Sequence, residues 1–111
     1  MAKEFIQSET EGPKGWTVWK VVGRIDTQTA DAAYQQGEAI VKKSEKTVLD
    51  MSQMDYLSSA GLRVLLRLNK LALKSGKRFT VSGSVGMVSS VLQDSGMDEL
   101  LKMKGSLEEL D

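Results

Sequence analysis

The sequence predicts a single α/β domain, spanning residues 1–111, with a mixed, largely parallel sheet and about four helices. Short apolar runs alternate with segments of helical periodicity along most of the chain. Such alternation favours right-handed crossovers between parallel strands. Turn-forming residues between the first two apolar runs predict an N-terminal hairpin on one side of the sheet. A chain of 111 residues is long enough to bury about two-thirds of its unfolded surface in one core.

The hairpin is predicted from residues 3–9 and 16–23, which flank the turn-forming segment Glu-Gly-Pro-Lys-Gly at 11–15. Apolar side chains occupy both faces of the second strand, with Val18 and Val22 on one and Trp19 and Val21 on the other. A strand that is apolar on both faces is typical of the interior of a sheet.

The remaining elements are predicted in order as a helix at 28–43, a strand at 47–51, a helix at 59–74, a strand at 78–82, a helix at 85–94, a short strand at 100–103 and a helical turn at 107–110. Asp26, Thr27 or Thr29 is suited to cap the first helix, and Asp31 suits its first turn.

Composition excludes several classes of function. Fifteen basic and fifteen acidic residues cancel, so no overall field attracts nucleic acid or an anionic membrane. The absence of cysteine and histidine excludes disulfides, thiolate chemistry, histidine-based triads and nearly every zinc site. The chain opens without an apolar signal region and has no apolar run of about 20 residues. We therefore expect a cytoplasmic protein that neither inserts into a membrane nor binds nucleic acid.

Residues 55–62, Asp-Tyr-Leu-Ser-Ser-Ala-Gly-Leu, are the most informative stretch. Ser58 and Ser59 lie where a buried strand and its loop give way to the helix predicted at 59–74. Free N–H groups at a helix start give it a partial positive charge, so a serine there is suited to cap the helix or to carry a phosphate. As a plain cap, Ser59 contributes about 1 kcal/mol.

That helix carries a line of four cations without an acidic residue to neutralise them. Spacings of four, three and four place Arg63, Arg67, Lys70 and Lys74 along one face. Leu65, Leu68 and Ala72 lie opposite and are expected to face the sheet. The line is either a solvated face or, with its leucine flanks, a docking surface for an acidic or amphipathic partner.

Other candidate sites carry weaker signals. Asp50 and Asp55 lie near a strand end, like the phosphoacceptor aspartate of receiver domains. Such domains also need an acidic pair after an earlier strand, and that pair is missing here. We therefore expect the Asp50 side chain to be hydrogen-bonded to nearby backbone. The loop at 83–86 has two glycines around Ser84, a weak phosphate-loop pattern, and Ser84 suits a cap and a contact at the rim of an interface. No acid and base groups converge, so we expect no enzymatic activity.

Four segments together resemble the STAS domain of bacterial anti-sigma-factor antagonists. They are Gly-Arg-Ile-Asp at 23–26, Val-Leu-Asp-Met-Ser at 48–52, Leu-Ser-Ser-Ala-Gly-Leu at 57–62 and Asp-Ser-Gly-Met at 94–97. The resemblance runs from about residue 4 to 110 with the same order of elements, and it implies a STAS-type fold.

The resemblance also implies a function. Members of that family bind an anti-sigma factor that is also a serine kinase, so that a sigma factor is released. The kinase uses its own ATP to phosphorylate the antagonist, which then dissociates, and a PP2C-type phosphatase reverses the step. By this resemblance the chain itself needs no cofactor, because the kinase holds the ATP, and we expect the free protein to be a monomer.

Residue by residue, the resemblance places Ser59 at the phosphorylated position, with Ser58 as the alternative. The usual motif has aspartate before that serine and serine after it, whereas Ser58 and Ala60 stand there in this chain. Asp26 matches a kinase-contacting acid, and Gly23 matches a tight exit from the strand. The expected partner-binding residues are Gly23, Arg24, Asp26, Thr27, Ser58, Gly61, Arg63, Arg67 and Ser84.

A second hypothesis stays open. The chain would then be a non-switching STAS subunit of a stress-signalling scaffold or of a lipid-transport complex, and its serines would only cap the helix.

Overall fold

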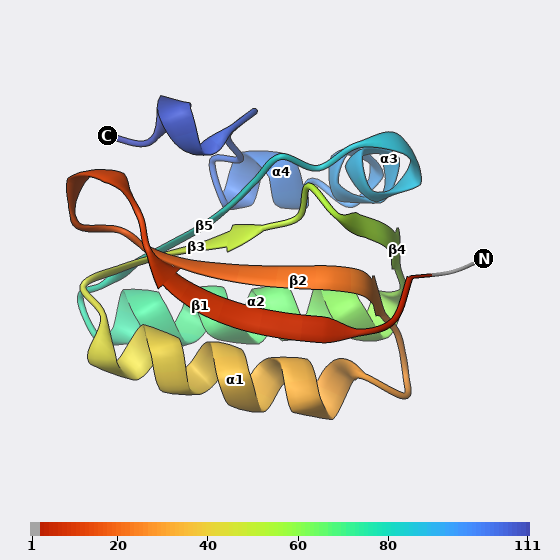
Figure 1. The fold of residues 1–111 in the computed structure, drawn as a ribbon, viewed down its shortest axis with the longest axis horizontal. Coiled ribbons are helices and arrows are strands. Elements are labelled where there is room, and N and C mark those ends of the chain that lie inside the picture. The colour runs from red at the N-terminus through yellow and green to blue at the C-terminus, as the bar shows by residue number, and fades with distance from the viewer. Residues whose placement is uncertain (1–2) are drawn as a thin grey trace.

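The computed structural model describes residues 3–111, which form one five-stranded sheet covered on both faces (Figure 1). The strands are β1 (Ile6–Glu11), β2 (Thr17–Ile25), β3 (Lys46–Asp50), β4 (Met54–Leu57) and β5 (Arg78–Ser82). The order is β1-β2-β3-β5, and β4 pairs with the second half of β2. β1 and β2 are antiparallel and the other pairs are parallel. The predicted mixed, largely parallel sheet with an N-terminal hairpin is confirmed.

Four α-helices cover the sheet, as expected. Figure 1 shows α1 (Ala30–Lys43) and α2 (Ser59–Lys74) on one face, and α3 (Gly86–Asp94) and α4 (Met97–Leu100) on the other. Two short 3-10 helices, η1 (Pro13–Gly15) and η2 (Leu107–Glu109), lie in the hairpin and near the C-terminal end. None of the helices within residues 3–111 has both the length and the apolar content to cross a bilayer.

β2 is an internal strand, as predicted, because it pairs with β1, β3 and β4. The face of Trp19 and Val21 is buried, and on the other face Val18 is buried and Val22 is partly buried. Trp19 and Val21 are fully buried in the larger core cluster, while Val18 packs in a second cluster with Val48 and Leu110. α1 packs closely against Trp19 at Gly37, which has no side chain. A Cβ added at Gly37 would lie 2.8 Å from the indole ring. The hairpin strands are shifted from their predicted ends: β1 begins at Ile6, and β2 continues to Ile25.

Two predictions for the sheet were wrong or incomplete. β4 was not predicted as a strand, although its four residues pair with β2. The strand expected at 100–103 is absent: Leu100 ends α4, Lys102 adopts a left-handed conformation with φ 53°, and only Lys104 forms a bridge, with Ser82. The apolar side chains at 100–103 are therefore carried by a helix end and a turn.

Candidate functional site

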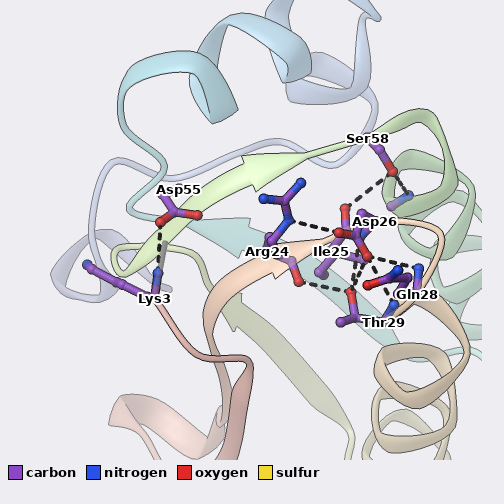
Figure 2. Close-up of polar contacts among 9 residues, drawn as sticks. Lys3, Arg24, Ile25, Asp26, Gln28, Thr29, Asp55 and Ser58 are labelled. Carbon is purple, nitrogen blue, oxygen red and sulfur yellow. Dashed lines mark hydrogen bonds and ion pairs between the residues drawn. The ribbon is translucent and has the colours of Figure 1, made fainter. Parts of the chain in front are cut away.

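Ser58, rather than Ser59, caps α2. Its hydroxyl accepts a hydrogen bond from the backbone N–H of Gly61 (3.4 Å) and donates one to the carbonyl of Ile25 (3.3 Å), as Figure 2 shows. Its backbone N–H also donates to the Ile25 carbonyl, at 3.0 Å. The reading of Ser59 as a plain cap is therefore wrong, because the cap position lies one residue earlier.

Ser59 is the first residue of α2 and is exposed. Within residues 3–111 its hydroxyl has no hydrogen-bond partner, in contrast to that of Ser58. The free N–H groups of the first helical turn surround this position with partial positive charge. The Ser59 oxygen is thus open to an approaching enzyme, in an environment that tolerates an anion.

Gly61 was expected in the partner-binding surface, but it is buried. A Cβ at this position would lie 2.4 Å from Leu57 Cδ1 and 3.0 Å from the carbonyl oxygen of Ile25. Gly61 therefore lets the first turn of α2 pack directly on the ends of β2 and β4. Its role is internal packing, which sequence spacing alone does not distinguish from contact with a partner.

Gly23 is also buried and does not form the strand exit that was expected. It has φ 93°, and the register between β2 and β4 shifts between Gly23 and Arg24. A Cβ would lie 2.8 Å from the carbonyl oxygen of Lys3. Gly23 thus forms a bulge inside β2 beneath the N-terminal segment, so it offers no surface for a partner.

Asp26 caps α1 through a reciprocal pair of hydrogen bonds with Thr29 (Figure 2). The Asp26 N–H donates to Thr29 Oγ1 at 3.0 Å, and the Thr29 N–H donates to Asp26 Oδ1 at 3.2 Å. The Gln28 N–H also donates to Oδ1, at 2.9 Å. This reciprocal pair has the pattern of a capping box, placed in the turn that leads into α1, where Thr29 is the N-cap residue. Of the three residues considered as caps for this helix, Asp26 and Thr29 are hydrogen-bonded to each other, whereas Thr27 is exposed.

Arg24 fixes the other oxygen of Asp26. Its Nε donates to Asp26 Oδ2 at 2.8 Å, and its guanidinium lies 4.5 Å from the centre of the Tyr56 ring. Desolvation alone would raise the pKa of Asp26, but hydrogen bonds from Gln28, Arg24 and Thr29 outweigh it and lower the pKa below its usual value. Asp26 is therefore ionised at neutral pH and held in one orientation.

Two open depressions flank Ser59. The first, of about 580 Å³, is lined by Arg24, Asp26, Thr27, Tyr56 and Ser58, together with Lys3, Phe5, Gln28 and Thr29. The second, of about 310 Å³, is lined by Thr27, Ala30, Asp31, Ala60, Arg63, Val64 and Arg67. We call the two depressions and Ser59 the Ser59 face. Six predicted partner-binding residues meet there, and Tyr56 joins them although it was not predicted.

The four cations of α2 are all exposed, and Leu65, Leu68 and Ala72 are buried beneath them, as predicted. The Arg67 guanidinium stacks on the Tyr34 ring at 3.7 Å from its centre. Within residues 3–111, none of the four lies in a salt bridge. The line thus begins at the Ser59 face with Arg63 and Arg67 and continues along α2.

Ser84 lies outside the Ser59 face. Its hydroxyl bonds to Ser89 Oγ at 2.8 Å and contacts the sulfur of Met103 at 3.3 Å. Ser84 does not cap α3, whose N-cap residue is Val85, and its expected contact with a partner stays a prediction. Asp50 accepts a hydrogen bond from the Ser52 N–H at 2.9 Å, which confirms that it bonds to nearby backbone.

Comparison with known proteins identifies the family by sequence, and solved structures share the fold. Residues 13–102 match the family model described as "Mlab, STAS domain". The anti-sigma F factor antagonist of Paenibacillus polymyxa is 29% identical over 98 residues, covering 86% of this chain and 84% of that protein. An anti-sigma factor antagonist from Mycobacterium paratuberculosis has a similar structure, with a TM-score of 0.85 and 24% identity over 96% of this chain and 90% of that one.

The phosphorylated form of the Bacillus cell fate determinant SpoIIAA shares the fold at a TM-score of 0.70 and 13% identity, covering 94% of this chain and 95% of that one. The family match extends across most of the chain and includes both helices that border the Ser59 face. This chain therefore belongs to the STAS domain family.

Proposed function

We propose that this protein is an anti-sigma-factor antagonist that acts in the cytoplasm as a regulator rather than as an enzyme. In its unphosphorylated form it binds an anti-sigma serine kinase through the Ser59 face, and phosphorylation of Ser59 ends that binding. The observation that carries the proposal is the exposed Ser59 hydroxyl at the start of α2, which has no hydrogen bond to any of the residues that the structure describes. The name of the Paenibacillus polymyxa relative supports the same function.

The hydrogen bonds favour Ser59 over Ser58 as the phosphoacceptor. A phosphate ester on Ser58 could no longer donate to the Ile25 carbonyl, and it would disturb the cap on Gly61. Loss of such a cap costs about 1 kcal/mol, and Ser58 is also half-buried. Modification of Ser59 breaks no hydrogen bond within residues 3–111, so it leaves the start of α2 intact.

A phosphate on Ser59 changes the surface more than the fold. It brings about −1.5 to −2 charges at neutral pH. The helix start and Arg63, four residues on along the exposed side of α2, favour that charge within the domain. A partner packed over Ser59 must accommodate the same charge in a dry interface. A loss of about 2.8 kcal/mol weakens such a complex about 100-fold, so a local charge suffices to separate the proteins.

The kinase, in this proposal, supplies the ATP, and a PP2C-type phosphatase removes the phosphate. Asp26, held by Arg24 and by the start of α1, gives the kinase a fixed negative charge beside Thr27. Arg63 and Arg67 present positive charge on the other side of Ser59. The kinase surface that fits this face therefore has a cation opposite Asp26 and carboxylates opposite the two arginines.

Intact-mass analysis after incubation with the cognate anti-sigma kinase and ATP tests the acceptor. We expect one added phosphate on the native chain and on Ser58→Ala, and none on Ser59→Ala. Ser90→Ala is the matched control, since Ser90 is an exposed serine on α3. Labelling that survives in Ser59→Ala but is lost in Ser58→Ala would move the site by one residue. No labelling, with partner binding unaffected by Ser59→Glu, would favour the non-switching subunit.

A further inference from the structure

Asn69 is a polar residue on the buried side of α2, where Leu65, Leu68 and Ala72 also lie. It is 8% exposed, and within residues 3–111 its side-chain amide has no hydrogen-bond partner. Buried polar side chains nearly always have a partner, because leaving one without a hydrogen bond destabilises the fold. The Asn69 amide is therefore available to a ligand that reaches it.

Asn69 lines a cavity of about 280 Å³ at the outer edge of β5. Leu73, one turn further along α2, lines it as well, together with Phe79 of β5 and with Leu100 and Leu101 at the end of α4. Leu73 and Leu100 are 69% and 50% exposed, so the apolar wall is open to solvent at these two residues. We call this space the Asn69 cavity. Its volume is just below the range of about 300–1,000 Å³ that holds drug-sized ligands, which favours a smaller molecule.

The Asn69 cavity is lined by more cations than anions. Its charged lining residues, among those that the structure describes, are Lys77, Arg78, Lys102, Lys104 and Asp111. Arg78 pairs with Asp111 at 2.8 Å, and Lys77 donates to a backbone carbonyl of α1. The ammonium groups of Lys102 and Lys104 have no hydrogen bond or salt bridge within residues 3–111. These two groups are the cations that a ligand can engage.

Lys102 and Lys104 lie on a turn that is fixed to β5. The Thr80 hydroxyl donates to the carbonyls of Leu101 (2.6 Å) and Lys102 (3.2 Å), and the Lys104 N–H donates to the Val81 carbonyl at 3.0 Å. Lys102 has φ 53°, a conformation that glycine adopts with less strain. A lysine there keeps a positive charge beside the cavity despite the strain, as is typical of functional positions.

We propose that the Asn69 cavity binds a small organic acid, composed of an apolar body and one carboxylate. The apolar body lies against Leu73 and Leu100, and a ligand oxygen accepts a hydrogen bond from the Asn69 amide. The ammonium groups of Lys102 and Lys104, on long flexible side chains, attract the carboxylate. The same lysines would repel a cationic ligand, and a neutral one would leave their charges unused.

The Asn69 cavity is separate from the Ser59 face. Asn69 lies ten residues after Ser59 on α2, which is about 15 Å along the helix axis. The cavity shares no lining residue with either depression of the Ser59 face. We therefore expect Ser59→Glu to leave the affinity for the acid unchanged, and this inference does not depend on the phosphorylation of Ser59.

An NMR titration of the full chain tests the ligand class. The probes are phenylacetate, cinnamate and hexanoate at millimolar concentration, at constant pH and ionic strength. Their primary amides keep the apolar body without the charge, and acetate keeps the charge without the apolar body. We expect at least one of the three acids to shift the side-chain amide signals of Asn69 and the backbone amides of residues 100–104. Its primary amide and acetate should bind more weakly.

Two variants of the cavity test the contacts. Asn69→Leu removes the amide but keeps the volume, so it should weaken binding of the acid about 10-fold without lowering the free energy of unfolding. Lys102→Gln combined with Lys104→Gln should also weaken it about 10-fold. The matched control is Lys70→Gln combined with Lys74→Gln, which removes two exposed lysines of α2 outside the cavity and should leave binding unchanged.

Absence of a shift at the Asn69 side chain with all three acids would overturn the proposal. Primary amides that bind as tightly as the acids would show that charge plays no part in recognition. Undiminished binding to Asn69→Leu, or an equal loss in the two double-lysine variants, would place the acid elsewhere on the surface.

Discussion

Ser58 and Ser59 are neighbours with different surroundings. The Ser58 hydroxyl bonds to the backbone of Gly61 and Ile25, whereas the Ser59 hydroxyl is exposed and has no partner within residues 3–111. The first side chain stabilises the start of α2, and the second is available for chemistry. Their contributions to stability should therefore differ, although the two residues are chemically identical.

We predict that Ser58→Ala lowers the free energy of unfolding by about 1 kcal/mol, because it removes the cap of α2. Ser59→Ala should change it by less than about 0.5 kcal/mol, as is usual for exposed positions. Urea unfolding of the two variants and the native chain measures both values. Equal losses in the two variants would contradict the assignment of the cap to Ser58.

Asp26 should give the fold a measurable dependence on pH. Its pKa is lowered in the folded state, so its charge stabilises the fold above the unfolded value of about 3.9. That stabilisation is lost as the pH falls through the folded pKa. We predict that the difference in unfolding free energy between the native chain and Asp26→Asn shrinks as the pH falls from about 5 to 2.

Asp111 serves as the internal reference for that experiment. Hydrogen bonding from Arg78 lowers its pKa, and it is present in both proteins, so both should lose stability in acid. The asparagine introduced by Asp26→Asn keeps one oxygen for the hydrogen bonds from Gln28 and Thr29, and loses the charge together with the acceptor for Arg24 Nε. A difference that stays constant with pH would show that the charge of Asp26 does not stabilise the fold.

At the scale of elements, the contact between α2 and the end of β2 depends on Gly61. We predict that Gly61→Ala lowers the free energy of unfolding by about 1–3 kcal/mol, as overpacking of a core does. The better helix propensity of alanine offsets at most about 1 kcal/mol of that loss. Lys70→Ala, on the exposed side of α2, is the matched control and should have little effect. A Gly61→Ala variant as stable as the native chain would mean that the Leu57 side chain and the Ile25 carbonyl yield to the added methyl group at little cost.

Much of the element order could be predicted from the sequence, because long periodic segments fix their own structure. The predicted bounds of α2 and β5 agree with the structure, and α2 has its apolar face at the expected residues. β4 was not predicted, because four residues are too few to show a repeated alternation of apolar and polar side chains. Pairing with β2 is what makes this segment a strand. The strand predicted at 100–103 was wrong, because a short apolar run is equally compatible with a helix end.

The candidate site could be predicted only in part. The Ser59 position follows from the helix start and from the resemblance to the STAS family, and Asp26 follows from its place before α1. The roles of Gly23 and Gly61 could not be predicted, because both depend on backbone and side chains from distant segments that touch them. Tyr56 was missed for the same reason: its place at the Ser59 face depends on β4 pairing with β2.

At the scale of the whole molecule, the fold should tolerate a charge at Ser59. Negative charge in the first turn of a helix stabilises it by about 0.3–1 kcal/mol. We predict that Ser59→Asp leaves the free energy of unfolding unchanged or raises it within that range, and that the circular dichroism spectrum stays the same. A loss of more than about 1 kcal/mol would indicate that the charge acts by unfolding α2.

Calorimetry gives the affinity of the cognate anti-sigma kinase for the native chain before and after enzymatic phosphorylation, and so measures the effect of the phosphate on binding. We predict that one phosphate on Ser59 weakens binding about 100-fold, or about 2.8 kcal/mol, while amide chemical shifts away from the start of α2 stay unchanged. Equal affinity of the two forms, or loss of binding with shifts throughout the sheet, would contradict a local charge switch on an intact fold.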